Sequence, residues 1–206
     1  MDRSTRSRPL PPPGPDPHAH RTRILRQARA DFFLQGYSRF TMDGLAAELG
    51  MSKKTLYVHF AGKDEIIGAV IDDLAAEIRA AADALMASRA LNLAEKLRAF
   101  IEGLMERLAA LSPATLRDLQ RFAPQLHLRL EEVRGRTLPY VFGRFIEEGQ
   151  RTGLVRPSVP IGFATEFLLQ AVQGMMQPAA LERLRLAPRE VIATAINLYF
   201  GGLLTP

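Results

Sequence analysis

Residues 41–60, which read TMDGLAAELGMSKKTLYVHF, constrain the fold of this chain more than any other stretch. They predict two short helices, over about 42–49 and 53–59, that cross at a sharp angle through a tight turn. The crossing needs a small residue where the helices touch, and Ala46 meets that need. Gly50 suits a turn position with positive φ, which glycine adopts without steric cost. The stretch therefore predicts a helix-turn-helix.

The ends and the core of this motif can also be assigned from the sequence. Thr41 is the expected N-cap of the first helix and Ser52 that of the second, because hydroxyl side chains accept backbone N–H groups at these positions. Leu45, Leu49 and Leu56 are expected to close the apolar core under the crossing. A generic amphipathic hairpin could show some of these features, but all of them in register are considerably more specific.

The second helix of the motif carries a polar, basic face opposite its core. Lys and Thr can serve base edges or phosphates, whereas Tyr and His more often bond phosphate. The predicted DNA-binding residues on this helix and its cap are Ser52, Lys53, Lys54, Thr55, Tyr57 and His59. Each of them could instead be an exposed polar side chain of a surface helix, and Tyr57 could equally be half-buried in the core.

The net charge of +5 is unevenly distributed along the chain. Residues 1–60 contain ten Lys and Arg but five Asp and Glu, while the remainder is balanced. A basic end on a neutral body suggests a unit that binds a polyanion, or else a basic tail that aids solubility.

Helical periodicity runs nearly throughout from His20, without the alternating pattern of strands. The predicted fold is all-α, with a three-helix unit at 20–64, a helical body at 65–206 and a disordered Pro/Arg-rich tail at 1–19. Helices are expected at about 20–36, 42–49 and 53–59, from just after 62 to about 80, and at 93–111, 113–121, 124–152, 159–177 and 188–204.

The motif resembles the N-terminal DNA-binding domain of the TetR family of bacterial repressors over about residues 20–70. The matching residues are Gly36-Tyr37, Thr41, Leu45-Ala46, Gly50, Met51-Ser52, the run Thr55 to Phe60, and Lys63-Asp64-Glu65. The resemblance implies that DNA is touched by Thr41, Lys53, Lys54, Tyr57, His59 and Lys63. Met42 departs from the pattern, since many members have a β-branched residue there, and the Pro-rich extension is unusually long.

The resemblance also implies that the body forms a dimer and binds a small molecule. The segment from Phe163 to Met176 carries an apolar stripe, and the final helix is apolar on more than one side. This suits helices buried against their own body and against a symmetry mate, although ordinary core is the alternative. The predicted dimer-interface residues are Phe163, Phe167, Ala171, Val172, Val191, Ala195, Leu198 and Tyr199.

Candidate ligand-pocket residues lie on the middle helices, where each could also be plain core. They are Phe100, Leu104, Leu108, Phe122, Leu126, Phe142 and Met175. His127 is a possible polar anchor or a surface histidine. Three arginines could pair with an acidic ligand or merely solvate a helix face, namely Arg117, Arg121 and Arg129.

The resulting hypothesis is a ligand-responsive homodimeric repressor, released from a palindromic operator in double-stranded DNA when an unknown effector binds the body. No cofactor or metal is expected, because the chain has no cysteine, no HExxH helix, no Gly-rich phosphate loop and only four scattered histidines. These features also argue against an enzyme. A helical scaffold or small-molecule carrier with a vestigial helix-turn-helix is the second alternative, and the Lys53-Lys54 pair argues against it.

The expected location is cytoplasmic and nucleoid-associated. No signal peptide is evident, because residues 9–17 are Pro-rich where an apolar segment would be needed. The most apolar long stretch, 161–180, is interrupted by polar residues and by Pro178, so no membrane span is expected.

Overall fold

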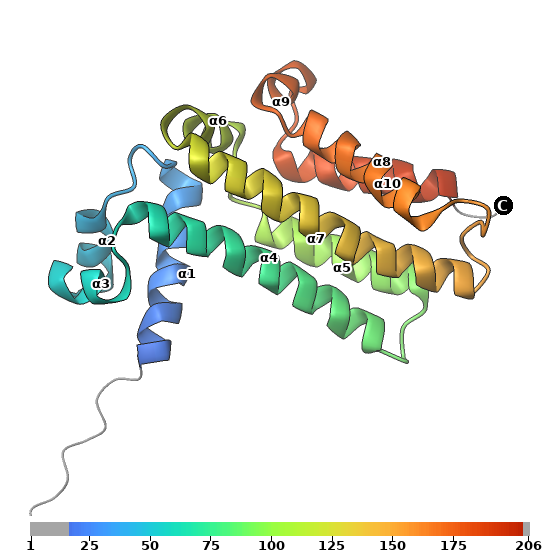
Figure 1. The fold of residues 1–206 in the computed structure, drawn as a ribbon, viewed down its shortest axis with the longest axis horizontal. Helices are drawn as coiled ribbons and strands as arrows, with labels where there is room; N and C mark the ends of the chain where they lie inside the picture. Colours follow the sequence, from blue (N-terminus) through green and yellow to red (C-terminus); the bar gives the residue numbers. More distant parts are fainter. Residues whose placement is uncertain (1–16, 204–206) are drawn as a thin grey trace, which may run out of the picture.

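The computed structural model describes residues 17–203, and these residues form helices joined by short turns, with no strand among them (Figure 1). The helices are α1 (Pro17–Gln35), α2 (Met42–Leu49), α3 (Lys53–His59), α4 (Lys63–Ala87), α5 (Leu93–Arg107), α6 (Pro113–Phe122), α7 (Pro124–Arg151), α8 (Ile161–Met175), α9 (Pro178–Leu184) and α10 (Pro188–Leu203). The all-α prediction is therefore confirmed.

Proline explains where the predicted and observed elements differ most. Helix α1 begins at Pro17, three residues before the predicted start, and the rest of the expected tail, residues 1–16, lies outside the described residues. The sequence does not predict α9, because Pro178 reads there as a helix breaker. Proline is well tolerated in the first turn of a helix, and Pro178 occupies that position in α9.

Two further helices are shorter than predicted. Helix α5 ends at Arg107, before the expected 111, because the chain turns at Leu108 with φ −100° and ψ 3°. Helix α8 starts at Ile161 after the extended Pro160, which fixes its N-terminal boundary. The helices are otherwise those that the apolar periodicity predicts.

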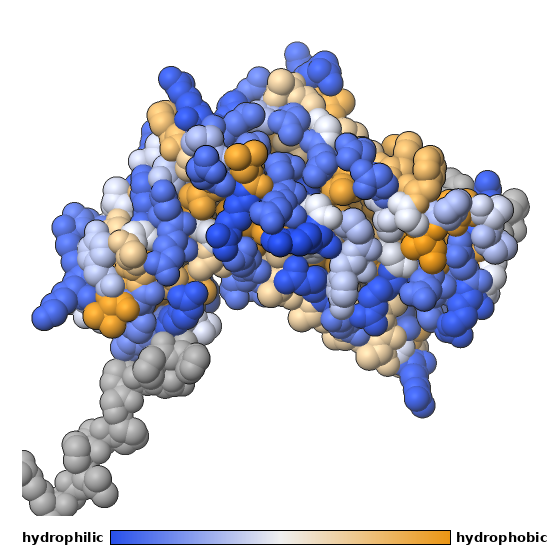
Figure 2. Space-filling model, viewed as in Figure 1, coloured by the Kyte–Doolittle hydropathy of each residue, from blue (hydrophilic) through white to orange (hydrophobic). Residues whose placement is uncertain are grey.

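The helices divide into a small head and a larger body. Helices α1, α2 and α3 pack against the N-terminal half of α4, at the left of Figure 1. In the body, α4, α5 and α7 lie beside one another, and α8 and α10 cover the other side of α7 and α5. Figure 2 shows a mostly hydrophilic surface interrupted by hydrophobic patches, including over α8 and α10.

The core of the head runs without a break into the body. Ile66, Ile67 and Val70 of α4 are buried among the side chains of α1, α2 and α3. The same apolar cluster includes Leu119 of α6 and Leu126 of α7. The predicted boundary between residues 64 and 65 therefore falls inside a continuous helix that belongs to both parts.

Truncation of Leu56 tests the core beneath the helix crossing. Its side chain is 0% exposed, so Leu56→Ala leaves a cavity and is expected to lower the free energy of unfolding by about 2–5 kcal/mol. Val58→Ala is the matched control, because Val58 lies on the same helix and is 76% exposed. Its truncation is expected to change stability by less than about 0.5 kcal/mol. Thermal unfolding followed by circular dichroism measures both, and equal melting temperatures would contradict this core.

Candidate nucleic-acid interface and ligand cavity

The turn of the helix-turn-helix has the geometry that its sequence predicts. Ala46 is buried where α2 meets α3. Gly50 ends α2 in the left-handed region, with φ 62° and ψ 31°. The next amide, that of Met51, donates to the carbonyl of Ala46 at 3.0 Å. This bond, together with the bond from the Gly50 amide to the carbonyl of Ala47, satisfies carbonyl groups at the end of α2, where the chain turns sharply into α3.

Both predicted N-caps are confirmed. Thr41 Oγ1 accepts the amide of Gly44 at 3.1 Å. Ser52 Oγ accepts the amide of Thr55 at 3.1 Å and also lies 2.8 Å from its hydroxyl oxygen. The caps fix where α2 and α3 begin, and so they fix which side chains of α3 point away from the core.

Helix α3 directs its basic and aromatic side chains outward. Lys53, Lys54 and Tyr57 are exposed, while Thr55 and His59 are half-buried. The ammonium of Lys53 lies 2.5 Å from Asp43 Oδ1 in an exposed ion pair, a kind of pair that contributes little to stability. Lys54 has no ion-pair partner within residues 17–203, so its charge is available to a ligand.

Tyr57 is 52% exposed, which places it on the outer face of α3 rather than in the core. On α3 the residue that is buried in the core is Leu56. A phenol and an ammonium group thus lie side by side on one turn of the helix, as a surface that hydrogen-bonds phosphate requires.

Lys63, at the start of α4, is held against the head by two contacts. Its ammonium lies 3.9 Å from the centroid of the Tyr37 ring and 3.5 Å from the Tyr37 carbonyl oxygen. The Tyr37 hydroxyl donates to Asp64 Oδ1 at 2.5 Å. Burial, with the nearby Asp64 carboxylate, raises the pKa of Tyr37 to about 12, so this donor stays protonated. Lys63 is therefore presented from a fixed position.

Helix α1 contributes anchors that the sequence did not reveal. Arg23 Nη2 donates to the carbonyl of Leu49 at 2.8 Å and so neutralises the C-terminal end of α2. The guanidinium of Arg21 lies 4.5 Å from the Phe60 ring centroid. These arginines contribute to the basic charge of the head, and their contacts also hold α2 and the residue after α3 against α1.

The head is also fastened to α6 of the body. Asp118 Oδ2 accepts the amide of Ser38 at 2.6 Å, and the buried Thr115 hydroxyl donates to the carbonyl of Phe33 at 3.1 Å. A Cβ on Gly36, whose φ is 81°, would lie 2.8 Å from Asp118 Oδ2. Glycine thus serves two purposes here, since it ends α1 and lets the carboxylate approach.

A second link joins α1 to α4 and to the end of α5. Arg29 Nη1 lies 2.9 Å from Glu77 Oε2, and Arg29 Nη2 donates to the Arg107 carbonyl at 3.2 Å. Arg107 Nε approaches the same carboxylate at 3.6 Å. The head is therefore held from two sides of α1.

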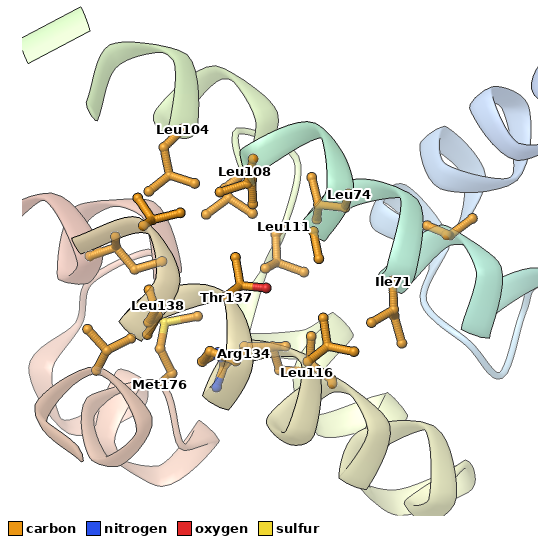
Figure 3. A pocket seen from close by; sticks show the side chains of 18 of the residues that line it. Ile71, Leu74, Leu104, Leu108, Leu111, Leu116, Arg134, Thr137, Leu138 and Met176 are labelled. Atoms are coloured by element: carbon orange, nitrogen blue, oxygen red, sulfur yellow. The ribbon is translucent and has the colours of Figure 1, made fainter. Parts of the chain in front are cut away.

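A cavity of about 120 Å³ lies within the body and reaches the head. Its wall is supplied by α4, α5, α6, α7, α8 and α10, and Phe32 and Phe33 of α1 close the end that faces the head. Figure 3 shows the aliphatic side chains that converge on it, with Arg134 and Thr137 on the wall that α7 supplies. Any occupant of this cavity would touch both the head and the body.

Four of the predicted pocket residues line the cavity, and three do not. Those that line it are Phe100, Leu104, Leu108 and Phe142. Phe122 is 53% exposed at the end of α6, where the chain turns into α7. Leu126 is buried below the head instead. Met175 packs against the body core, but the next residue along the chain, Met176, lines the cavity.

The polar candidates of the body also differ from the expectation. Arg117 pairs with Glu182, and Arg129 pairs with Asp72, both on the surface. Arg121 is exposed beside Phe122, and half-buried His127 does not line the cavity. The arginine that does line it, Arg134, was not singled out, because nothing local distinguishes it from the other arginines of α7.

The predicted dimer residues separate into an outer and an inner set. Phe163, Phe167 and Leu198 are exposed, and Ala171 is half-buried. The inner set is buried in the core of the chain itself, because α8 and α10 each turn one apolar face toward the body. Its members are Val172, Val191, Ala195 and Tyr199.

An aromatic stack joins the outer faces of α8 and α10. The Phe163 and Phe167 rings stack with centroids 6.5 Å apart, and Phe167 stacks on Tyr199 at 6.4 Å. Burial raises the pKa of Tyr199 to about 12, and its hydroxyl has no hydrogen-bond partner among the described residues. Two exposed phenylalanines beside a buried, unsatisfied hydroxyl mark this surface as apolar and incompletely covered.

The part of the chain that the structure describes holds neither a metal-binding cluster nor a helix suited to span a membrane. No group of three or more His, Asp or Glu side chains there is placed to hold a metal ion. None of the helices over the described range combines the length and the apolar character that crossing a membrane requires.

Comparison with known proteins agrees with this architecture. Residues 24–70 match the sequence profile described as "Bacterial regulatory proteins, tetR family". An HTH-type transcriptional regulator of Bacillus subtilis (strain 168), YvaF, described as uncharacterized, is 31% identical over 109 residues. That match covers 53% of this chain and 57% of YvaF, so little more than half of either protein is aligned.

Solved structures share the whole fold at low identity. The regulatory protein TetR from Rhodobacter sphaeroides is 17% identical with a TM-score of 0.66, covering 88% of this chain and 97% of that one. SmeT of Stenotrophomonas maltophilia, solved as a complex with triclosan, is 19% identical with a TM-score of 0.65, covering 91% and 92%. The matching profile lies on the helix-turn-helix described above, so residues 24–70 form a domain of the tetR family of bacterial regulatory proteins.

Proposed function

We propose that this chain is a transcriptional regulator that binds double-stranded DNA as a homodimer, with its affinity for DNA controlled by a small molecule in the body cavity. The observation that carries the proposal is the outer face of α3, where Lys54 and Tyr57 are exposed on a helix whose caps and core are fully accounted for. A recognition helix lies in the major groove in this way, with its N-terminal residues toward base edges and backbone.

The residues around α3 suit contacts with phosphates on either side of the groove. Thr41 and Lys63 flank α3 at the starts of α2 and α4, and both are held in place by hydrogen bonds or ring contacts. Lys53 would exchange its exposed carboxylate partner for a phosphate. We infer that Ser52, Thr55 and His59 complete the surface, with smaller contributions because they are already engaged or half-buried.

A neutralising substitution at Lys54 tests this surface. Lys54→Ala is expected to weaken DNA binding and to lower the slope of log K against log salt by about one per subunit, because one phosphate contact is lost. The measurement is a salt titration by fluorescence anisotropy with promoter DNA found by footprinting. Arg89→Ala is the control, since Arg89 is exposed in the turn that follows α4, at the end away from the head, and should leave the slope unchanged.

The salt titration also discriminates between this proposal and the carrier alternative. A regulator that reads DNA through basic side chains loses affinity steeply as salt increases. DNA binding that is insensitive to salt in the unmodified protein, or equal slopes for Lys54→Ala and Arg89→Ala, would contradict the assignment of α3 as the recognition helix.

Dimerisation is proposed through the outer faces of α8 and α10. Phe163, Phe167 and Leu198 are exposed there, and a symmetry mate would cover the three of them together. The inner residues Val172 and Tyr199 would support this face from behind. A twofold dimer would place two recognition helices about 34–36 Å apart, which matches successive major grooves of a palindromic site.

A charge on the outer face of α8 tests the dimer. Phe167→Asp is expected to yield a folded monomer, because an unpaired carboxylate would be buried in the interface, whereas the Phe167 side chain is 59% exposed in the single subunit. Leu128→Asp is the control, since Leu128 is also an exposed apolar residue but lies on α7. Analytical ultracentrifugation gives the mass, and an intact Phe167→Asp dimer would refute this interface.

Ligand control is inferred from the position of the cavity. Its wall includes Phe32 and Phe33 of the head and Val172 and Met176 of α8, so one occupant would touch the DNA-binding and dimerising parts at once. A ligand that binds better to the form in which the heads are wrongly spaced would release DNA. SmeT is described as the repressor of a multidrug efflux pump and binds triclosan. We propose repression of the same kind for this chain.

A further inference from the structure

We propose that the effector is a small, mainly apolar anion, such as a carboxylate on an aromatic ring or a short alkyl chain, with its charged group bound at the α7 wall of the cavity. This inference rests on the proposed function, because it takes the cavity as the effector site. It adds the chemical class of the ligand and the residues that select it.

The size and the lining of the cavity define the apolar part of the ligand. At about 120 Å³ it is somewhat smaller than the engineered cavity of about 150 Å³ that binds benzene. Leucine, isoleucine, valine and phenylalanine side chains from seven helices make up nearly the whole wall. A single ring or a short alkyl chain therefore fits with little rearrangement.

The polar side chains on the wall offer more hydrogen-bond donors than acceptors to the cavity. Arg134 and Thr137, both on α7, are the polar side chains that line the cavity (Figure 3). Arg134 has a side chain 12% exposed, and its Nη1 bonds Glu131 Oε1 at 2.6 Å. Its other N–H groups have no hydrogen-bond partner within residues 17–203. A ligand oxygen at this wall could accept from these N–H groups in a charge-assisted hydrogen bond.

Thr137 offers a second donor. Its side chain is buried, and its oxygen accepts a hydrogen bond from Arg79 Nη1 at 3.2 Å across the gap between α4 and α7. No acceptor for the Thr137 hydroxyl proton lies among the described residues. One lone pair of the Thr137 oxygen thus accepts from the Arg79 guanidinium, while the hydroxyl proton remains available to an acceptor in the cavity.

The balance of charge at this wall favours an anion over a neutral acceptor. Outside the cavity, a groove between α4 and α7 is lined by Arg79 together with two ion pairs, Arg129 with Asp72 and Arg136 with Glu132. Arg134 likewise has its carboxylate. Arg79 has no carboxylate partner in the described part of the chain, so one positive charge remains next to Thr137.

The groove and the cavity meet at this point. Ala75 of α4 and Val133 of α7 line both of them, so only small side chains separate the unpaired guanidinium from the cavity. An anionic group at the wall would accept from Thr137 and Arg134 and compensate the charge of Arg79. Charge-assisted hydrogen bonds of this kind are about twice as strong as neutral ones.

Matched pairs of probes test the proposal directly. Benzoate is compared with benzamide, and hexanoate with hexanamide, because each pair has the same shape and differs in charge. Isothermal titration calorimetry on the full-length protein without DNA is expected to show a Kd of about 1 mM or tighter for the carboxylates. The amides are expected to bind about tenfold to a hundredfold more weakly.

Variants then locate the preference at the α7 wall. Two variants are each expected to abolish most of the preference for carboxylates. One is Arg79→Gln. The other is the double variant Glu131→Gln with Arg134→Gln, which removes both partners of that ion pair and so leaves no carboxylate unpaired. Arg136→Gln is the control, because Arg136 is an exposed arginine on the same helix with its own glutamate partner. Melting temperatures establish that each variant is folded, and a variant that does not fold is replaced by Thr137→Val, for which a smaller loss is expected.

Three outcomes would overturn the proposal: carboxylates that bind no better than amides, carboxylates that do not bind at about 1 mM, or an Arg136→Gln variant that loses the preference as fully as Arg79→Gln. Failure of the proposed function would look different. A protein that prefers carboxylates but binds no DNA supports the ligand class and contradicts the regulator, whereas a protein that binds DNA and ignores carboxylates contradicts the ligand class alone.

Discussion

Helix α4 is the element on which the rest of the structure depends. Its N-terminal half is buried in the core of the head through Ile66, Ile67 and Val70, and its C-terminal half packs on α5 and α7. With 25 residues it is about 37 Å long. Because a helix with a buried face along both halves cannot bend freely, a shift of its C-terminal half relative to α7 must move the head. The position of α3 relative to the body therefore depends on how α4 packs on α5 and α7.

A second constraint prevents the head from pivoting around α4 alone. The Thr115 hydroxyl bonds the carbonyl of Phe33, and Asp118 bonds the amide of Ser38, so α6 holds the end of α1. Phe33 also forms part of the cavity wall. One residue thus connects the cavity, α6 and the head, and a change in the packing around it reaches α1 without passing through α4.

The helix-turn-helix could be predicted from the sequence because its determinants are local. The cap at Thr41, the small Ala46 and the left-handed Gly50 each act on atoms within a few residues along the chain. The body offers no such signals. Phe122 is as apolar as Phe100, yet one is exposed and the other lines the cavity, because only the second lies where α5 faces α7. Such choices are made by tertiary packing.

The same reasoning explains why Arg134 and the dimer face needed the structure. Arg134 differs from Arg136 by two positions on α7, about 200° around the helix, and this rotation places one at the cavity wall and the other at the surface. The sequence shows that α8 and α10 carry many apolar residues, but the structure is needed to assign them to an inner and an outer face. Phe167 lies on the outer face and Val172 on the inner one.

That α8 has two faces has an energetic consequence for control. Its inner face, with Val172 and Met176, touches the cavity, while its outer face carries Phe163 and Phe167. In the proposed dimer, an occupant would therefore act on the spacing of two heads by two routes, through α4 and α1 within one subunit and through α8 between subunits. Coupling between sites is reciprocal. In the proposed mechanism, in which the effector releases DNA, operator DNA would therefore weaken effector binding by the same factor, about 5- to 150-fold for 1–3 kcal/mol. Binding the effector with and without operator DNA thus measures the same quantity as binding DNA with and without the effector.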